Sequence, residues 1–270
     1  MRMIGVLDPV YVRARAALLD AVEALDAQLD AVVLVGAQAI YLHTGDSDLA
    51  VAEYTTDADF AISPVELAAS PLIDDLLTQA GFTPREHPGG WLSPTGVYVD
   101  LMVPEALAGP GTRGARLGRH GKRAARRAKG LEGALVDRNK HTVSALDPAD
   151  ARQVPIWVAG PAALFVAKIH KIAERVDAHD RVRDKDALDV LRLLRSVDTD
   201  VLADRLRSLL AHDLTRSVTQ EAVALLPQLF GTQQSDGVQM VVRAAGTGED
   251  AATIAASMIA LVADLRTSLD

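Results

Sequence analysis

Paired aspartates are the residues of this chain whose spacing most directly suggests metal chemistry. The Asp-x-Asp spacing occurs at 46/48, 57/59, 184/186 and 198/200, so the spacing alone is a weak signal. The pair Asp57 and Asp59 differs from the others because residues 57–62 alternate with period two, which is typical of a strand with one buried face. Residues two apart in a strand face the same way, so we expect these carboxylates to lie close together. Like charges at that spacing repel, and a divalent cation is the usual partner that stabilises them.

A third carboxylate, Asp100, lies within an apolar run at residues 97–103 that also predicts a strand. An unpaired carboxylate is costly in such surroundings. If the two strands are neighbours in a sheet, Asp57, Asp59 and Asp100 can surround Mg²⁺ or Mn²⁺, since these hard cations prefer oxygen ligands and keep positions for water and for nucleotide phosphates. The alternative is a solvated Asp57/Asp59 edge, with Asp100 satisfied by a local hydrogen bond.

The elements that would position these carboxylates belong to a sheet in the first part of the chain. Short runs rich in β-branched residues predict strands over residues 31–35, 57–62, 97–103, 142–146 and 154–158. Apolar residues at three- and four-residue spacing predict helices over residues 9–30, 37–43, 63–80, 162–175, 185–196, 201–212, 220–229 and 251–270. We therefore expect an α+β protein, with a mixed β-sheet and flanking helices in residues 1–160 and a helical bundle in residues 161–270.

The composition excludes several other classes of site. The chain has no cysteine, which rules out disulfides, zinc–thiolate sites and cysteine nucleophiles. Its seven histidines form no H-E-x-x-H ligand pair. The first residues lack an apolar run of signal-peptide length, and no segment approaches about 18 uninterrupted apolar residues. We expect a soluble, cytoplasmic protein that does not bind membranes.

A wider motif connects the three aspartates with a turn. Gly36-Ala37-Gln38-Ala39 follows the strand at 31–35, and Thr55 precedes the Asp57/Asp59 pair in the pattern Thr-x-Asp-x-Asp-Phe. Together with the later Asp100, this arrangement resembles the DNA polymerase β-like nucleotidyltransferase superfamily. The resemblance implies that Gly36, Ala37 and Thr55 help to hold a nucleoside triphosphate. It also implies that the three aspartates are catalytic and hold two metal ions, which activate the attacking hydroxyl and stabilise the leaving pyrophosphate.

Within that superfamily, the second half of the chain is similar to the AbiEii/MenT toxins of toxin–antitoxin systems. Residues 168–175 resemble the lysine helix of that family, and residues 183–190 resemble its R-x-K-D-x-x-D motif. The resemblance implies catalytic roles for Lys168 and Asp186, and nucleotide contacts from Lys168 and Lys171. A solvated basic face and a surface salt bridge at Asp186 are the alternatives.

Two positions depart from the pattern of the family. Ala37 replaces the usual Ser or Gly, so phosphate contacts at this residue are limited to backbone N–H groups. Glu53 stands where the family often has Arg.

The net charge of −8 is unevenly distributed, because one segment carries eight cations and no acidic residue. These cations are Arg113, Arg116, Arg119, Lys122, Arg123, Arg126, Arg127 and Lys129. We expect residues 109–130 to form an exposed, mobile loop or a marginal helix. Two interpretations remain open. The segment could contact the phosphate backbone of RNA, or it could be a loop that only increases solubility.

These patterns predict a metal-dependent nucleotidyltransferase that transfers NMP from an NTP to an acceptor hydroxyl. By family resemblance, a tRNA 3′ end is the leading acceptor, other RNA the next, and a cognate antitoxin protein an expected partner. The alternative is a catalytically weakened protein of the same fold that binds nucleotide or RNA as a regulator.

Overall fold

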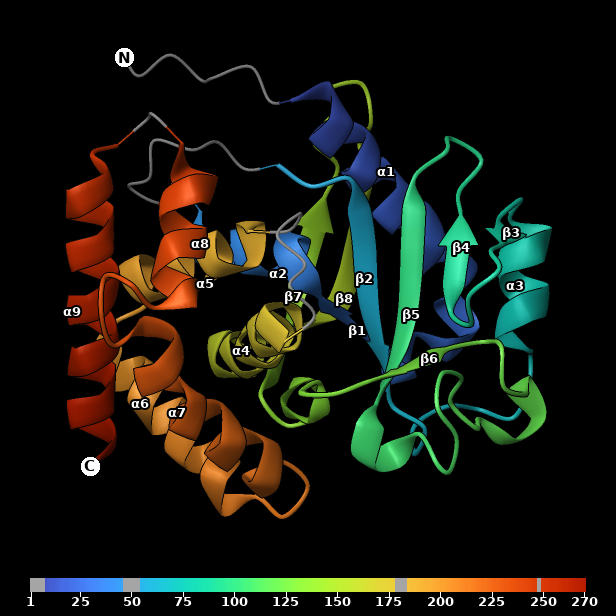
Figure 1. Cartoon of the computed structure of the whole chain (residues 1–270). Coiled ribbons are helices and arrows are strands. Elements are labelled where there is room, and N and C mark those ends of the chain that lie inside the picture. The colour runs from blue at the N-terminus through green and yellow to red at the C-terminus, as the bar shows by residue number, and fades with distance from the viewer. Residues whose placement is uncertain (1–7, 46–53, 178–183, 247–248) are drawn as a thin grey trace. The chain divides into compact units, whose positions relative to one another are not determined.

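The computed structural model describes residues 8–45, 54–177, 184–246 and 249–270 (Figure 1). It confirms the α+β class, with 54% of the residues in helices and 16% in strands. The chain divides into two compact units. Unit 1 comprises residues 1–38, 53–128 and 139–158, and unit 2 comprises residues 39–52, 129–138 and 159–270. The two short segments 39–52 and 129–138 therefore belong to the mainly helical unit. The predicted division into residues 1–160 and 161–270 places them in the other unit.

A mixed sheet forms the frame of the candidate site. Its strands are β1 (Val32–Val35), β2 (Asp57–Ile62), β3 (Thr83–Pro84), β4 (Gly90–Leu92), β5 (Tyr98–Pro104), β6 (Arg126–Ala128), β7 (Arg138–Ser144) and β8 (Gln153–Ala159). The spatial order is β3-β4-β5-β2-β1-β8-β7, and β6 pairs with β5 outside this path. β2 is parallel to β5 and antiparallel to β1, and β1 is parallel to β8. The central strand β1 is an unbroken apolar run and is buried along its whole length, as burial on both faces requires.

The register of β2 and β5 fixes which side chains share a face. Asp57 is opposite Tyr98, and Asp59 is opposite Asp100. Directly opposite residues in neighbouring strands point to the same side of the sheet. On the other face of β2, Ala58, Phe60 and Ile62 are buried, as their alternation with the aspartates predicts. The three aspartates therefore lie on one face of the sheet, while the apolar residues of β2 anchor the opposite face in the core.

Helix α1 (Pro9–Ala24) begins where its sequence provides a cap. Asp8 accepts a hydrogen bond from the backbone N–H of Val10 at 2.7 Å, and Pro9 occupies the first helical position. The helix is shorter than the predicted range 9–30, because a 3-10 helix, η1 (Asp26–Ala31), follows it. α1 packs against β2 and β5.

The helix predicted over residues 63–80 is wrong in its first half. Only α3 (Ile73–Gln79) is helical. Pro71 lacks a backbone N–H and disfavours helical geometry in the residue before it. The buried side chain of Gln28 holds the non-helical segment, since its amide donates to the carbonyls of Ala68 and Pro71 and accepts from the N–H of Ala68.

The basic segment contains regular structure, which differs from the expected loop or marginal helix. It contains the 3-10 helix η3 (Gly118–His120) and β6, which runs parallel to β5. Ala115, Ala124 and Ala125 are fully buried, and the N–H of Ala115 donates to the carbonyl of Ala125 at 2.9 Å. The small alanines between the arginines provide the apolar surface that lets this highly charged segment pack, a signal that charge counting overlooks.

The described part of unit 2 is mainly a helical bundle. Its helices are α4 (Pro161–Asp177), α5 (Lys185–Ser196), α6 (Thr199–Ala211), α7 (Arg216–Phe230), α8 (Asp236–Ala245) and α9 (Ala251–Leu269). α2 (Gly36–Thr44) begins in unit 1 and ends in unit 2, and the 3-10 helices η2 (Glu105–Leu107) and η4 (Glu132–Leu135) are short connections. The sequence patterns missed α8, whose range contains Gly237 and is followed by Gly246.

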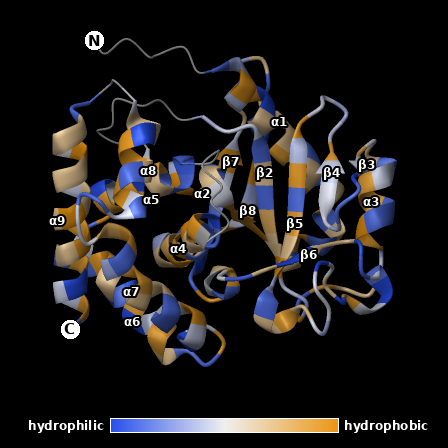
Figure 2. Cartoon of the chain, viewed as in Figure 1, coloured by the Kyte–Doolittle hydropathy of each residue, from blue (hydrophilic) through white to orange (hydrophobic). Residues whose placement is uncertain are grey.

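Among the described helices, α9 alone is long and apolar enough, by length and composition, to cross a membrane. Its buried residues Ile254, Met258, Val262 and Leu265 follow a helical spacing, and α9 packs against α6 and α8. Burial of one face of α9 is typical of a helix that packs on a bundle. The helices of unit 2 carry both hydrophobic and hydrophilic residues (Figure 2).

We expect backbone amides of the basic segment to be protected from hydrogen exchange. The N–H groups of Ala115 and Arg127 bond to the carbonyls of Ala125 and Arg113, both at 2.9 Å. Hydrogen–deuterium exchange measured by mass spectrometry should be at least about tenfold slower in peptides covering 113–129 than in the same peptides of the urea-unfolded chain. Equal rates in the two states would mean that β6 does not persist in solution.

Candidate functional site

The turn between β1 and α2 lies directly against one of the candidate aspartates. Gly36 has φ +72°, a conformation that residues with a Cβ rarely adopt. A Cβ atom at this position would overlap with the carboxylate of Asp59. Glycine is therefore required at residue 36 both by its backbone angle and by the close approach of Asp59. The predicted turn and the predicted carboxylate pair thus meet within unit 1.

Each of the other two candidate carboxylates has a partner. Asp57 accepts a hydrogen bond from the hydroxyl of Thr55 at 2.7 Å, and Thr55 is fully buried. Asp100 pairs with Arg126 at 3.5 Å, and both side chains are about one-third exposed, at 30% and 35%. In this structure Thr55 orients Asp57, and Arg126 of the basic segment lies beside Asp100.

The donor set suits a hard cation in its chemistry. Asp57 and Asp59 offer carboxylate oxygens from one face of β2, and Asp100 stands opposite Asp59 in the register. Across the described ranges, however, no group of three or more His, Asp or Glu side chains is placed to hold a metal ion. A cation bound here would compete with Arg126 for the carboxylate of Asp100.

A buried polar network behind the turn was missed by the sequence analysis. Arg15 of α1 is buried, and its Nε donates to the side-chain oxygen of Gln38 at 2.9 Å. Gln38 in turn donates to the carbonyls of Asp57, at 2.9 Å, and Ala14. The network ties the first turn of α2 to the start of β2. The available signal was the position of Arg15 on the apolar stripe of α1, between Tyr11 and Leu18, where a charge needs a buried partner.

The motif residues of unit 2 form a buried ionic cluster. Lys168 is only 5% exposed, and its Nζ donates to Asp186 and Asp189, both at 2.6 Å. Arg175 also pairs with Asp186. Lys171 lies 3.9 Å from Asp186, and its side chain is 41% exposed. Lys168 and Asp186 are therefore brought together inside the bundle, which contradicts the alternative of a solvated face and a surface salt bridge at these two residues.

Among the described residues, three cations of the basic segment form ion pairs with acidic groups. Arg126 pairs with Asp100, and Arg127 pairs with Glu105 at 3.3 Å. Lys129, in unit 2, donates to Glu221 at 2.5 Å, and this hydrogen bond lowers the pKa of Glu221.

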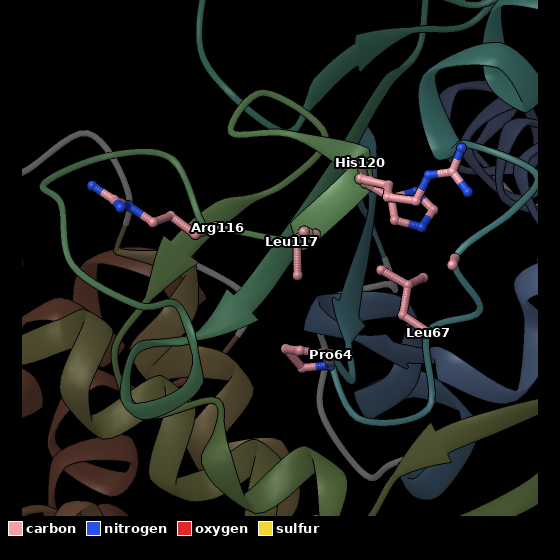
Figure 3. A pocket seen from close by; sticks show the side chains of 8 residues that line it. Pro64, Leu67, Arg116, Leu117 and His120 are labelled. Carbon is pink, nitrogen blue, oxygen red and sulfur yellow. The ribbon is translucent and has the colours of Figure 1, made fainter.

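One cavity of about 330 Å³ in unit 1 is lined by apolar residues such as Pro64 and Leu67 and by residues 116–120 of the basic segment (Figure 3). His120 at its edge is fully hydrogen-bonded, because Nδ1 accepts from the N–H of Ile73 at 3.1 Å and Nε2 donates to the carbonyl of Ala68 at 2.8 Å. The side chain of Arg116 extends away from Leu117 and His120 (Figure 3). The lining of this cavity does not include the three aspartates.

No family model, curated protein or solved structure matches this chain. The resemblance to nucleotidyltransferases therefore depends on the motif residues and their arrangement.

Replacing Gly36 by Ala should cost more stability than the same change at another glycine with positive φ. Gly96 has φ +78°, and a Cβ there meets nothing within 4 Å. We expect Gly96→Ala to cost about 1 kcal/mol for the backbone angle, and Gly36→Ala to cost about 1–3 kcal/mol more because Asp59 must move. Urea unfolding of both variants measures the difference. Equal losses would contradict the close contact of Gly36 with Asp59.

Replacing Lys168 by Ala should strongly destabilise the protein. The change leaves Asp186 and Asp189 buried without their shared cation, which typically costs about 3–5 kcal/mol. The matched change Lys171→Ala, at a half-exposed cation near the same carboxylate, should cost less than about 1 kcal/mol. The free energies of unfolding of the two variants test this prediction. Small and similar losses of stability in both variants would contradict the buried cluster.

Proposed function

We propose that this protein is a metal-dependent nucleotidyltransferase that transfers NMP from an NTP to an acceptor hydroxyl. The observation that carries the proposal is the meeting of three motif elements in unit 1. Gly36 of the turn lies against Asp59, and Asp59 stands opposite Asp100 in the parallel pair β2–β5. A turn at the start of a helix beside clustered carboxylates provides both halves of a nucleotide site, one for phosphate and one for cations.

The residues of the turn are suited to the triphosphate. The first N–H groups of α2, at residues 36–38, have no acceptor within the helix and lie at its positive end. Since Ala37 has no hydroxyl, these N–H groups are the phosphate ligands that the turn can offer. The backbone of Gln38 is held in place by its side-chain bonds to Arg15 and Asp57.

The carboxylates carry the chemical step. The acceptor oxygen forms a bond to the α-phosphorus, the bond from that phosphorus to the bridging oxygen breaks, and pyrophosphate leaves. The proton of the hydroxyl passes to a carboxylate of the cluster and from there to water. Mg²⁺ or Mn²⁺ bound by Asp57, Asp59 and Asp100 would lower the pKa of the hydroxyl and neutralise the leaving pyrophosphate. Arg126 must release Asp100 for this arrangement, and its guanidinium is then available to a phosphate.

The remaining assignments depend on the family resemblance. It favours an RNA acceptor, a tRNA 3′ end before others, and a cytoplasmic toxin with a cognate antitoxin. It also assigns catalytic roles to Lys168 and Asp186, and nucleotide contacts to Lys168 and Lys171. Of these, Lys171 is the cation that keeps an exposed side chain.

A second candidate function is a regulator that binds nucleotide or RNA without transfer. One observation favours it: Asp100 is already neutralised by Arg126, and Lys168 by Asp186 and Asp189. A site whose charges are internally paired can bind a ligand and still lack the free groups that the reaction needs.

Incubation with each α-labelled NTP, Mg²⁺ and total tRNA, followed by gel electrophoresis, tests the proposal. We expect labelled RNA and released pyrophosphate with wild type, and a loss of at least about 100-fold in Asp59→Asn and Asp100→Asn, because each removes a charge from the metal and proton-transfer site. Asp75→Asn, an exposed change of the same charge on α3, is the matched control and should keep full activity. Metal-dependent NTP binding with no pyrophosphate release would instead establish the regulator.

A further inference from the structure

Four of the eight cations of the basic segment line one cavity in unit 1. The cavity has a volume of about 270 Å³, and its cationic residues are Arg113, Arg116, Lys122 and Arg123. No carboxylate is among its lining residues. Arg126, Arg127 and Lys129, by contrast, form ion pairs with Asp100, Glu105 and Glu221. Burial raises the pKa of the Asp74 carboxyl, which is outside the lining, and of the four lining cations Arg123 lies close enough to oppose this rise.

Two of the guanidinium groups are positioned by backbone carbonyls. Arg116 donates from Nε to the carbonyl of Pro110 at 3.0 Å. Arg123 donates to the carbonyls of Arg85 and Glu86 at 2.9 and 3.1 Å. A guanidinium has five N–H donors, so each group retains donors for a ligand. Because their side chains are already held, less conformational entropy is lost when an anion binds.

The wall of the cavity is also fixed. Arg127 donates to the carbonyls of Gly109 and Gly111, and it pairs with Glu105 at the same time. Gly114 approaches the carbonyl of Lys122 so closely that a Cβ atom there would overlap with it. Arg127 is thus a positioning residue, since it holds the glycine-rich loop whose cations face the cavity.

We propose that this cavity binds two neighbouring phosphodiester groups of single-stranded RNA, the acceptor strand of the transfer reaction, and this identification rests on the proposed function. Planar guanidinium forks match phosphate oxygens and read no base. The lining contains no aromatic side chain for base stacking, so recognition is of charge and backbone. In a chain of net charge −8, four cations around one cavity, with no carboxylate in its lining, give a local site for a polyanion.

The salt dependence of RNA binding tests the cavity. The variant Arg113→Ala/Lys122→Ala removes two exposed cations of the lining and leaves the hydrogen-bonded Arg116 and Arg123 in place. The matched control Arg13→Ala/Lys140→Ala removes two exposed cations outside the cavity, with the same change in net charge. Binding of a labelled single-stranded RNA of about 12 nucleotides is followed by fluorescence anisotropy without NTP or Mg²⁺, from about 50 to about 300 mM KCl.

Each lost phosphate contact reduces the magnitude of the slope of log K against log salt by about 0.7. The slope of the cavity variant should therefore be smaller in magnitude than that of wild type by about 1.4. The variant should also bind RNA about tenfold more weakly near 100 mM salt. The control should keep the wild-type slope. Equal slopes for the two variants would overturn the proposal. It would also be overturned if inorganic phosphate or pyrophosphate bound wild type but not the cavity variant while RNA binding stayed unchanged, since the site would then take small anions.

Failure of the cavity and failure of the transferase proposal are distinguishable. If NMP transfer depends on Asp59 but the cavity and control variants show equal salt slopes of RNA binding, only the cavity proposal fails. If the cavity variant shows a reduced salt slope of RNA binding but the wild-type protein transfers no NMP, only the transferase proposal fails.

Discussion

The parallel pairing of β2 with β5 places Asp59 opposite Asp100, and the rest of the candidate site depends on this register. A shift of one residue would turn one of the two carboxylates to the other face of the sheet. The register is secured from behind, because Phe60 and Leu101 are opposite each other and both are fully buried. The apolar face thus determines on which side of the sheet Asp59 and Asp100 lie.

Compensation of charge is the second constraint, and it differs between the two units. In unit 1 the ion pair of Arg126 with Asp100 is partly exposed, so its exchange for another cation costs little. In unit 2 the pair of Lys168 with Asp186 and Asp189 is buried, and breaking it leaves charges that cannot reach water. The same residue types therefore form an exchangeable contact in one place and a structural core in the other.

The parts of the fold that follow from local patterns could be predicted from the sequence. The bounds of β2 and of α5 agree with residues 57–62 and 185–196, since alternation and amphipathic spacing act within each element. The predictions for residues 63–72 and for the basic segment failed for non-local reasons. Gln28 binds the backbone near Ala68, and Ala115, Ala124 and Ala125 are buried by contacts between segments.

The same division applies to the candidate site. The three aspartates and the turn at Gly36 could be recognised as motif residues, but the pairing of Arg126 with Asp100 required β6 to be placed beside β5. The burial of Lys168 likewise depends on how α4 and α5 pack, because a basic stripe next to an apolar stripe is compatible with either environment. The sequence shows which side chains are charged, but it does not show which residue each of them pairs with.

The strand order also bears on how the chain reaches this structure during synthesis. β1, near the start of the chain, has β2 on one side and β8 on the other, with Val33 opposite Trp157. The hairpin-like contact with β2 is available early, but the other edge of β1 stays open until residues up to β8 have emerged from the ribosome. Closing so long a loop carries an entropic cost before the new contacts form, and it slows the completion of the sheet. A nascent chain halted before residue 153 would therefore expose the backbone of an apolar strand, and such an edge invites pairing with other chains.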